Sequence, residues 1–223
     1  MSPLHAPAAR LTDLLTGLEP PPAPAALPEG MFLLRGRADP AVLAPLIETV
    51  AATAPFRFMK TKRGGQLSAA MTSCGVCGWV SDRRGYRYES IDPDTGRPWP
   101  TLPPAFRRLA AEASAEAGFP GFEPDTCLIN RYAIGSGMGL HQDADERDFG
   151  QPIVSVSLGL PTAFLIGGAE RRDRPGPLPL QSGDVMVFGG PARLLFHGVR
   201  PVKPGFDPLF GPFRYNLTFR RAR

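Results

Sequence analysis

Cysteine, histidine and long apolar runs are all scarce in this chain of 223 residues. Three cysteines, an odd number, do not make a disulfide framework and are typical of a reducing compartment. No apolar run approaches the roughly 18 residues of a membrane span, and the N-terminus lacks the basic and apolar regions of a secretory signal. We therefore expect a cytoplasmic protein that has no membrane partner.

The spacing of Cys74 and Cys77 is that of a C-x-x-C motif, which suggests zinc or redox chemistry. Only Cys127 remains as a further thiol, and no histidine lies close to the motif in the sequence. A zinc ion would therefore lack ligands. We expect three free thiols packed in the interior.

Hydrophobic residues make up 43% of the chain and charged residues 21%, which is typical of a soluble globular protein. The net charge of +4 permits a nucleic acid as partner without requiring one. Residues 1–30 hold a short amphipathic piece and then a run of prolines, so we interpret them as a flexible Pro/Ala-rich leader. Residues 31–223 have the length of a single β-rich domain.

Two helices are predicted before the middle of the chain. Asp39 and Pro40 have the residue types of an N-cap and a first helical position. The apolar face of this helix is expected to consist of Val42, Leu43, Leu46, Ile47 and Val50. A second helix, residues 104–117, carries a stripe of Phe106, Leu109, Ala110 and Ala113. Both helices are expected to brace the outside of a sheet.

Short apolar β-type runs separated by glycine and proline dominate the remainder. A first strand is predicted at residues 31–34. The later strands are predicted at 127–133, 152–159, 162–167, 184–188, 193–199 and 213–220. Many short antiparallel strands favour an α+β, mostly β, fold with a jelly-roll core, also called a double-stranded β-helix.

His141 and Asp143 are separated by one residue, so in an extended strand they lie on the same face while Gln142 points away. An imidazole beside a carboxylate supplies two thirds of a 2-His-1-carboxylate site for ferrous iron. His5 lies in the leader, so the third ligand is His197. A His-x-Asp pair taken alone is more often a solvated turn than a metal site.

The last predicted strand supports the metal interpretation. Arg214, Asn216, Thr218 and Arg220 alternate with apolar residues and share one face. Two arginines on one strand also occur at solvated edges. Their separation of about 20 Å, however, leaves room between inward-leaning side chains for one short dicarboxylic acid, and guanidinium groups bind carboxylates in a bidentate way.

Five stretches of this chain, in order, resemble the AlkB family of iron- and 2-oxoglutarate-dependent nucleic-acid demethylases. They are residues 127–132, 141–146, 153–160, 196–198 and 214–220. The resemblance implies a jelly-roll core with a nucleotide-recognition lid at about residues 56–100, and Fe(II), 2-oxoglutarate and dioxygen as cofactors. It also implies a monomer.

The activity that the resemblance implies is oxidative demethylation of 1-methyladenine and 3-methylcytosine. The expected partner is methylated single-stranded DNA, with duplex DNA or RNA as alternatives. In such a reaction 2-oxoglutarate is decarboxylated to succinate and the methyl carbon leaves as formaldehyde.

Site residues follow from the resemblance one by one. The iron ligands, which are also the catalytic residues, are expected to be His141, Asp143 and His197. The residues expected to bind 2-oxoglutarate are Asn130, Tyr132, Arg214, Asn216 and Arg220. We expect Arg214 to take the distal carboxylate and Arg220 to lie nearer the metal.

Four residues resemble those that contact the flipped-out base: Trp79, Tyr86, Asp145 and Arg171. Aromatic rings stack on bases, and the basic residues near this region can neutralise phosphates. Each has a plainer alternative. Trp79 can be a core residue, Arg171 a surface residue, and Asp145 a member of an acidic run whose other residues, Glu146 included, are expected to be mostly solvated.

The sequence departs from the family pattern at two positions. Gln66 stands where an aromatic residue is expected, in a loop that is more basic than usual, and Phe188 replaces a tryptophan. Neither residue is expected to touch the iron. Two other functions remain as alternatives: an oxygenase that acts on a protein side chain or a small molecule, and a jelly-roll binding protein without catalysis.

Overall fold

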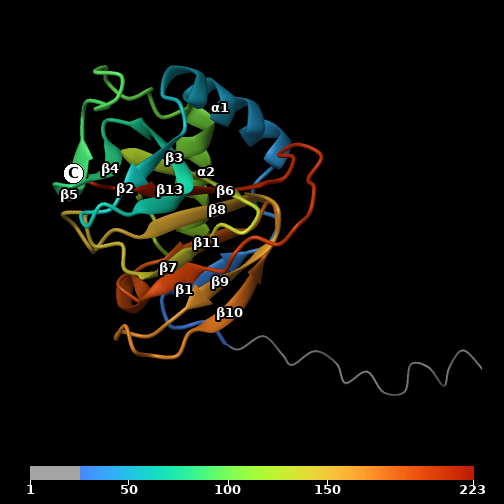
Figure 1. Cartoon of the computed structure of the whole chain (residues 1–223). Coiled ribbons are helices and arrows are strands. Elements are labelled where there is room, and N and C mark those ends of the chain that lie inside the picture. Colours follow the sequence, from blue (N-terminus) through green and yellow to red (C-terminus); the bar gives the residue numbers. More distant parts are fainter. Residues whose placement is uncertain (1–25) are drawn as a thin grey trace, which may run out of the picture.

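The computed structural model describes residues 26–223, and Figure 1 shows how the elements are arranged. His5 and the predicted amphipathic piece of the leader lie outside the described residues. Within the expected leader, Leu27 packs against a buried apolar cluster, and the Met31 backbone N–H donates to the Pro28 carbonyl at 3.0 Å. The first strand begins directly afterwards, at Met31.

Thirteen strands and two α-helices make up the described chain. The helices are α1 (Pro40–Thr53) and α2 (Pro104–Glu116), and a short 3-10 turn covers Gly190–Ala192. The strands are β1 (Met31–Leu34), β2 (Arg57–Lys60), β3 (Gln66–Gly75), β4 (Gly78–Asp82), β5 (Gly85–Glu89), β6 (Thr126–Ala133), β7 (Met138–His141), β8 (Ile153–Gly159), β9 (Thr162–Ile166), β10 (Gly176–Leu180), β11 (Val185–Phe188), β12 (His197–Val199) and β13 (Phe213–Arg220).

The strands form two main sheets and one hairpin. The larger sheet has the order β1-β11-β8-β13-β6-β3-β2, the smaller has the order β10-β9-β12-β7, and β4 pairs only with β5. Every pairing between these strands is antiparallel. This arrangement confirms the predicted mostly β jelly-roll core braced by helices (Figure 1).

Apolar residues fill two separate layers, one on each face of the larger sheet. On its outer face, Leu43 of α1 and Phe106 of α2 belong to a cluster that includes Leu217 of β13. Between the two sheets, Phe164 of the smaller sheet clusters with residues of the larger one, among them Phe188. The helices therefore close one face of the sheet, and the second sheet encloses the other.

The predicted start of α1 is confirmed, because the Asp39 side chain accepts a hydrogen bond from the Ala41 N–H at 2.9 Å. Leu43, Ile47 and Val50 are buried, as their spacing of four and three residues on one helical face requires. Val42 was wrongly placed on this face and is 50% exposed. It lies about 100° around the helix from Leu43, at the edge of the buried stripe.

The strand prediction for residues 193–199 is wrong for its first half. Only His197–Val199 pairs as β12, because the chain turns through Gly190–Ala192 and Arg193 follows with its backbone in a helical conformation. Five strands were not predicted at all: β2, β3, β4, β5 and β10. The extended strand expected to carry both His141 and Asp143 is β7, but it ends at His141. In β3, small and polar residues replace the apolar alternation on which the prediction relied.

The segment that we interpreted as a lid divides into two parts. Strand β3 pairs with β6, and its residues Ala69 to Cys74 are buried in the larger sheet. The β4–β5 hairpin and the turn between β2 and β3 lie outside the main sheets. Lid residues are therefore to be sought in these two pieces.

The three cysteines are free and buried, as expected. Cys74 of β3 and Cys127 of β6 are cross-strand neighbours in register, and burial raises the pKa of Cys77 to about 11. Burial also raises the pKa of Cys127, so Cys77 and Cys127 are protonated at neutral pH. Among the described helices, none has both the length and the apolar character that crossing a membrane requires.

Replacing Phe106 by alanine tests the outer apolar layer. Phe106 is fully buried, and its ring meets Phe219 edge-to-face with centroids 5.8 Å apart. We expect Phe106→Ala to lower the free energy of unfolding by about 3–5 kcal/mol in urea denaturation. Phe206→Ala is the matched control, since Phe206 is 77% exposed, and should change stability by less than about 0.5 kcal/mol. Equal effects would contradict this packing.

Candidate active site

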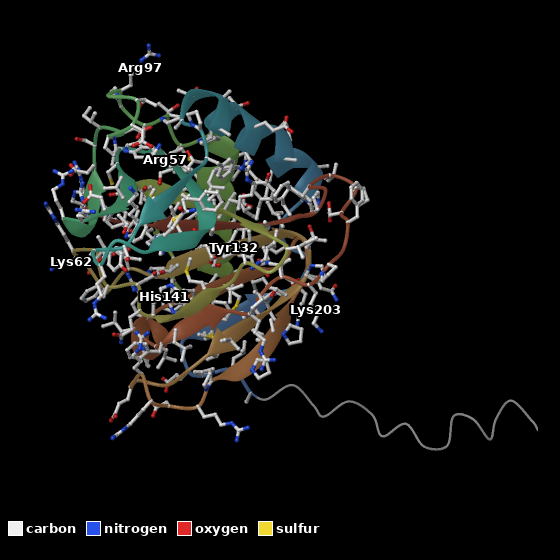
Figure 2. All side chains as sticks on the ribbon, viewed as in Figure 1. Arg57, Lys62, Arg97, Tyr132, His141 and Lys203 are labelled. Atoms are coloured by element: carbon white, nitrogen blue, oxygen red, sulfur yellow. The ribbon has the colours of Figure 1, made fainter. Side chains whose placement is uncertain are left out.

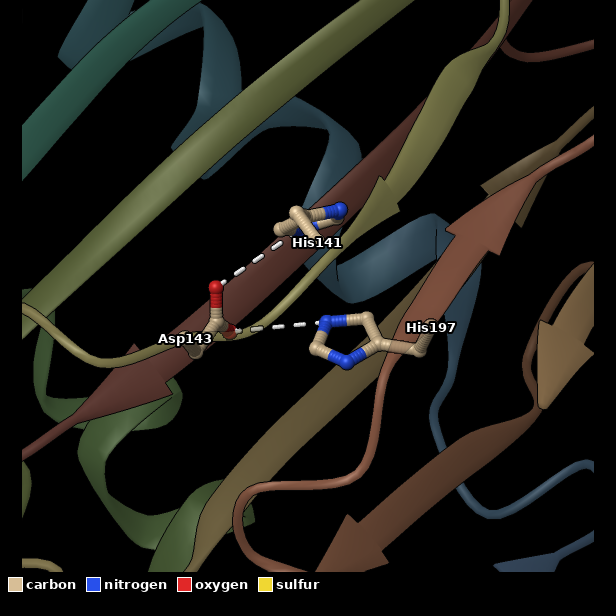
Figure 3. A group of neighbouring side chains, drawn as sticks. All are labelled: His141, Asp143 and His197. Atoms are coloured by element: carbon tan, nitrogen blue, oxygen red, sulfur yellow. Dashed lines mark ion pairs between the residues drawn. The ribbon is translucent and has the colours of Figure 1, made fainter. Parts of the chain in front are cut away.

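The side chains of His141, Asp143 and His197 converge on one another (Figure 3). His141 ends β7 and faces His197 of β12 in the strand register. Asp143 follows two residues after the end of β7, in chain without regular secondary structure. The ligand atoms of the three residues lie within 4.8 Å of one another. The β7–β12 pair thus brings the two histidines together, and the irregular chain after β7 brings Asp143 to them.

Both imidazoles are oriented by backbone carbonyls. His141 Nδ1 lies 2.9 Å from the Gly139 carbonyl oxygen, and His197 Nδ1 lies 3.0 Å from the Leu195 oxygen. Since a carbonyl can only accept, each Nδ1 carries a proton, and Nε2 is the nitrogen that can bind a metal. The Nε2 atoms of His141 and His197 point towards Asp143 at 3.7 and 3.8 Å.

The electrostatics of the triad suit a divalent cation. Burial lowers the pKa of His197 to about 4, so its imidazole is neutral at neutral pH. Burial opposes the charge on Asp143, but Arg220, with Nη2 only 2.5 Å from Oδ2, outweighs it and holds the pKa of that carboxyl well below its usual range. Two imidazole nitrogens and one carboxylate oxygen are the donor set for iron(II).

Arg214 is a buried cation with almost no partner. Its side chain is fully enclosed, and its one hydrogen bond runs from Nη2 to Ser157 Oγ at 3.1 Å. Nε and Nη1 are buried without a hydrogen-bond partner among the described residues. Burial lowers the pKa of Arg214 to about 10, so the guanidinium is charged at neutral pH. The unpaired N–H groups of this charged side chain are donors for the carboxylate of a ligand.

The other polar residues that we expected to bind 2-oxoglutarate line the same cavity as the triad. The cavity has a volume of about 350 Å³. The strand register places Asn130 opposite Asn216 and Tyr132 opposite Arg214. Asn216 donates to Ser155 Oγ at 2.8 Å, whereas Asn130 Oδ1 is buried without a partner. All five residues that we expected to bind 2-oxoglutarate are therefore brought together.

The four residues expected at the base also line this cavity. Trp79 and Tyr86 of the β4–β5 hairpin stack with ring centroids 5.4 Å apart, and Tyr86 is 52% exposed. Trp79 Nε1 donates to Asp145 Oδ2 at 2.8 Å. The Arg171 guanidinium lies over the Phe196 ring at 6.0 Å. Trp79 is thus a rim residue and not a core residue.

Three further residues of the site were missed by sequence analysis. Glu146, expected to be solvated, is buried, and this expectation was wrong. It accepts a hydrogen bond from the Tyr88 hydroxyl at 2.5 Å and pairs with Arg193 at 2.9 Å. Tyr88 was not among the expected site residues, and Arg193 was assigned to a strand. Their roles depend on contacts between distant segments, and a local sequence pattern does not predict such contacts.

Comparisons with known proteins agree with this site. Residues 30–220 match the 2OG-Fe(II) oxygenase superfamily. The alpha-ketoglutarate-dependent dioxygenase AlkB of Escherichia coli is 50% identical over 214 residues, which cover 95% of this chain and 98% of that protein. The chain belongs to the AlkB family of 2OG-Fe(II) oxygenases. The resemblance inferred from the motifs is confirmed.

Other AlkB-family proteins are also similar to this chain. The solved structure of OsALKBH1 superimposes with a TM-score of 0.77 at 32% identity, covering 88% of this chain and 99% of that one. The nucleic acid dioxygenase ALKBH1 of Mus musculus is 35% identical over 131 residues, which cover 58% of this chain and 33% of that protein. The chain is an Fe(II)- and 2-oxoglutarate-dependent dioxygenase, which excludes the alternative of a binding protein without catalysis.

The two arginines of β13 should respond oppositely to replacement by methionine in the ligand-free protein. Arg214→Met removes a buried cation that lacks partners, so the free energy of unfolding should rise by about 1–3 kcal/mol. Arg220→Met leaves Asp143 without its paired cation and removes one of the two cations beside Glu146, so it should lower the free energy of unfolding by about 3–5 kcal/mol. Urea denaturation at pH 7 measures both. A loss of stability in Arg214→Met as large as in Arg220→Met would contradict the description of Arg214.

Proposed function

We propose that this dioxygenase removes methyl groups from 1-methyladenine and 3-methylcytosine in DNA, with a preference for single strands. The observation that carries the proposal is the juxtaposition of stacked aromatic rings and a carboxylate, Trp79, Tyr86 and Asp145, in the same cavity as His141 and His197. Such a rim suits a flat ligand with a hydrogen-bond donor at its edge. The mouse relative, described as a nucleic acid dioxygenase, supports a substrate of this class.

His141, Asp143 and His197 are proposed to hold the iron and are the catalytic residues. Their three donor atoms lie on one side of the site, which leaves the opposite side free for other ligands. When bound, iron(II) with 2-oxoglutarate and dioxygen supplies the oxidation, in which 2-oxoglutarate becomes succinate and carbon dioxide and one oxygen atom enters the methyl C–H bond. The chain supplies position, charge and exclusion of water.

The five polar residues of the cavity are proposed to bind 2-oxoglutarate. Arg214 takes the distal carboxylate, because its Nε and Nη1 are buried and have no other partner in the described chain. Arg220 lies at the metal end beside Asp143 and adds positive charge there. Asn130, Tyr132 and Asn216 line the space between the two arginines and hydrogen-bond the co-substrate.

The base is proposed to enter between the metal ligands and the β4–β5 hairpin. Trp79 and Tyr86 present aromatic faces on which a flipped-out base stacks. A methyl group on the pairing nitrogen leaves 1-methyladenine and 3-methylcytosine cationic, so the carboxylate of Asp145 favours them and accepts a bond from the exocyclic amine. Arg171 lies at the same rim. After oxidation the methyl carbon leaves as formaldehyde and the unmodified base remains.

Residues 31–223 are proposed to act as one domain, whose lid within residues 56–100 consists of the β2–β3 turn and the β4–β5 hairpin. Lys62 projects from the first of these turns (Figure 2), and Arg63 and Arg83 are exposed too. These three side chains form no ion pair with the described chain, so they are free to contact phosphates. We further propose a monomer acting in the cytoplasm.

An oxygenase acting on a protein side chain or a small molecule would use the same metal site. The Trp79–Tyr86 stack favours a base over such substrates, because it offers an aromatic face at the rim of the cavity, where Tyr86 is exposed. RNA and duplex DNA are the alternatives within the nucleic-acid class. Activity on defined oligonucleotides separates all of these substrates.

The proposal is tested by anaerobic reconstitution with Fe(II) and 2-oxoglutarate, followed by air and a single-stranded oligonucleotide that carries one 1-methyladenine. We expect the oligonucleotide to lose the mass of one methylene, with one formaldehyde and at least one succinate formed per methyl removed. Mass spectrometry and product assays measure both. Succinate without a change in the oligonucleotide would refute the substrate and leave the oxygenase.

Two variants serve as controls for that experiment. Trp79→Ala should keep the substrate-independent conversion of 2-oxoglutarate but raise the KM for the oligonucleotide about tenfold, since stacking contributes roughly 1–3 kcal/mol per base. His141→Ala should abolish both reactions, because it removes a ligand of the metal. Normal demethylation by Trp79→Ala would show that the base binds elsewhere.

A further inference from the structure

The two segments that carry the metal ligands are joined by a reciprocal pair of side-chain bonds. Gln142, next to His141, donates from Nε2 to the Leu194 carbonyl at 2.6 Å. Arg193, next to Leu194, donates from Nη1 to the Asp143 carbonyl at 2.6 Å. Each segment therefore sends one side chain to the backbone of the other. We call these two bonds the brace.

Arg193 is the better-anchored member of the brace. Its residue is only 3% exposed, and all three of its nitrogens donate. Besides the Asp143 carbonyl, Nε bonds the Gln151 carbonyl at 3.0 Å and Nη2 bonds Glu146 Oε2 at 2.9 Å. A planar guanidinium fixes three acceptors at once, which the single ammonium of lysine cannot do in the same plane.

The contacts of Glu146 complete a ring that begins and ends on Asp143. Glu146 Oε1 lies 3.2 Å from Arg220 Nε, and Arg220 Nη2 lies 2.5 Å from Asp143 Oδ2. Starting at the Asp143 backbone carbonyl, the path runs through Arg193, Glu146 and Arg220 back to the Asp143 carboxylate. One network of buried charges thus holds both the backbone and the side chain of this residue.

Asp143 needs such support because no regular structure provides it. Strand β7 ends at His141, and residues 142–145 form neither helix nor strand. A metal ligand in irregular chain has a variable position unless side-chain contacts fix it. His141 and His197, in contrast, are fixed by their own strand pairing.

We propose that Arg193 is a positioning residue for Asp143: it sets the place of this carboxylate relative to His197 and thereby the affinity for the metal. The inference rests on the proposed assignment of His141, Asp143 and His197 as the iron ligands. A buried ion pair such as Arg193–Glu146 contributes little net stability, because desolvation offsets the attraction. We therefore assign the pair a geometric role, which is to hold Asp143 in place.

The test is a titration of the apo-protein with Co(II) in the presence of 2-oxoglutarate, followed by the visible absorption of the bound ion. Arg193→Lys keeps the positive charge but cannot form the three hydrogen bonds of the guanidinium. The dissociation constant for Co(II) should therefore rise about 10–100-fold. Arg37→Lys is the matched control, since Arg37 also bridges two carboxylates, Glu112 and Glu116, but on the exposed surface. It should bind Co(II) like the unaltered chain.

A second variant, Gln142→Leu, removes the other bond of the brace without touching a buried charge. It should raise the Co(II) dissociation constant too, with a melting temperature of the apo-protein close to that of the unaltered chain. Unaltered affinity in both folded variants would overturn the inference. An Arg193→Lys protein that does not fold, combined with normal affinity in Gln142→Leu, would assign Arg193 to folding and overturn it as well.

The outcomes separate this inference from the proposed function. If the unaltered chain binds no Co(II), or if His141→Ala binds it equally well, the metal site itself is wrong. If the unaltered chain binds one Co(II) and loses it in His141→Ala, but Arg193→Lys and Gln142→Leu retain it, only the positioning role fails. A rise in the dissociation constant with an unchanged KM for the oligonucleotide would support the role at the metal and not at the substrate.

Discussion

Strand β13 lies in the middle of the larger sheet, between β8 and β6, and its two faces meet different surroundings. Leu217 and Phe219 point into the apolar layer beneath the helices, whereas Arg214, Asn216 and Arg220 point into the cavity. Because side chains alternate with a period of two, a slip of one residue would place both arginines in the apolar layer. The cavity therefore exists only in this register, which eight consecutive pairs with β6 fix.

The cavity also gathers charges that a folded protein normally avoids burying. Arg220 is balanced by Asp143 and Glu146, but Arg214 has only the hydroxyl of Ser157. An unpaired buried cation lowers the stability of the ligand-free protein, and a bound carboxylate removes that cost. The unpaired Arg214 therefore favours ligand binding at the expense of stability in the ligand-free protein. We expect binding of a dicarboxylate to stabilise the fold.

The sequence predicts those parts of the fold and site in which neighbouring residues carry the signal. The alternation in β13, the Asp39-Pro40 start of α1 and the His141-x-Asp143 pair are local, so each could be recognised before the structure was known. Strand β3 was not predicted because most of its residues are small or polar and are buried on both faces, so the sequence shows no alternation of apolar and polar residues.

Charged residues in the interior were harder still to predict. Glu146 directly follows the exposed Asp145, and its contacts with Arg193, far along the chain, and with Tyr88, in the hairpin, explain why it is buried. A sequence pattern reports the polarity of a residue and not the distant partner that neutralises it. The same limit applies to Arg214, whose missing partner becomes visible only in three dimensions.

The central claim is that three ligands on β7, its extension and β12 hold the metal while Arg214 holds the co-substrate. An anaerobic crystal structure with Mn(II) in place of iron and with 2-oxoglutarate tests it most directly. We predict that the metal binds His141, Asp143 and His197, and that the distal carboxylate accepts hydrogen bonds from the guanidinium of Arg214. A metal bound without Asp143, or a distal carboxylate that leaves Arg214 without a partner, would contradict the account.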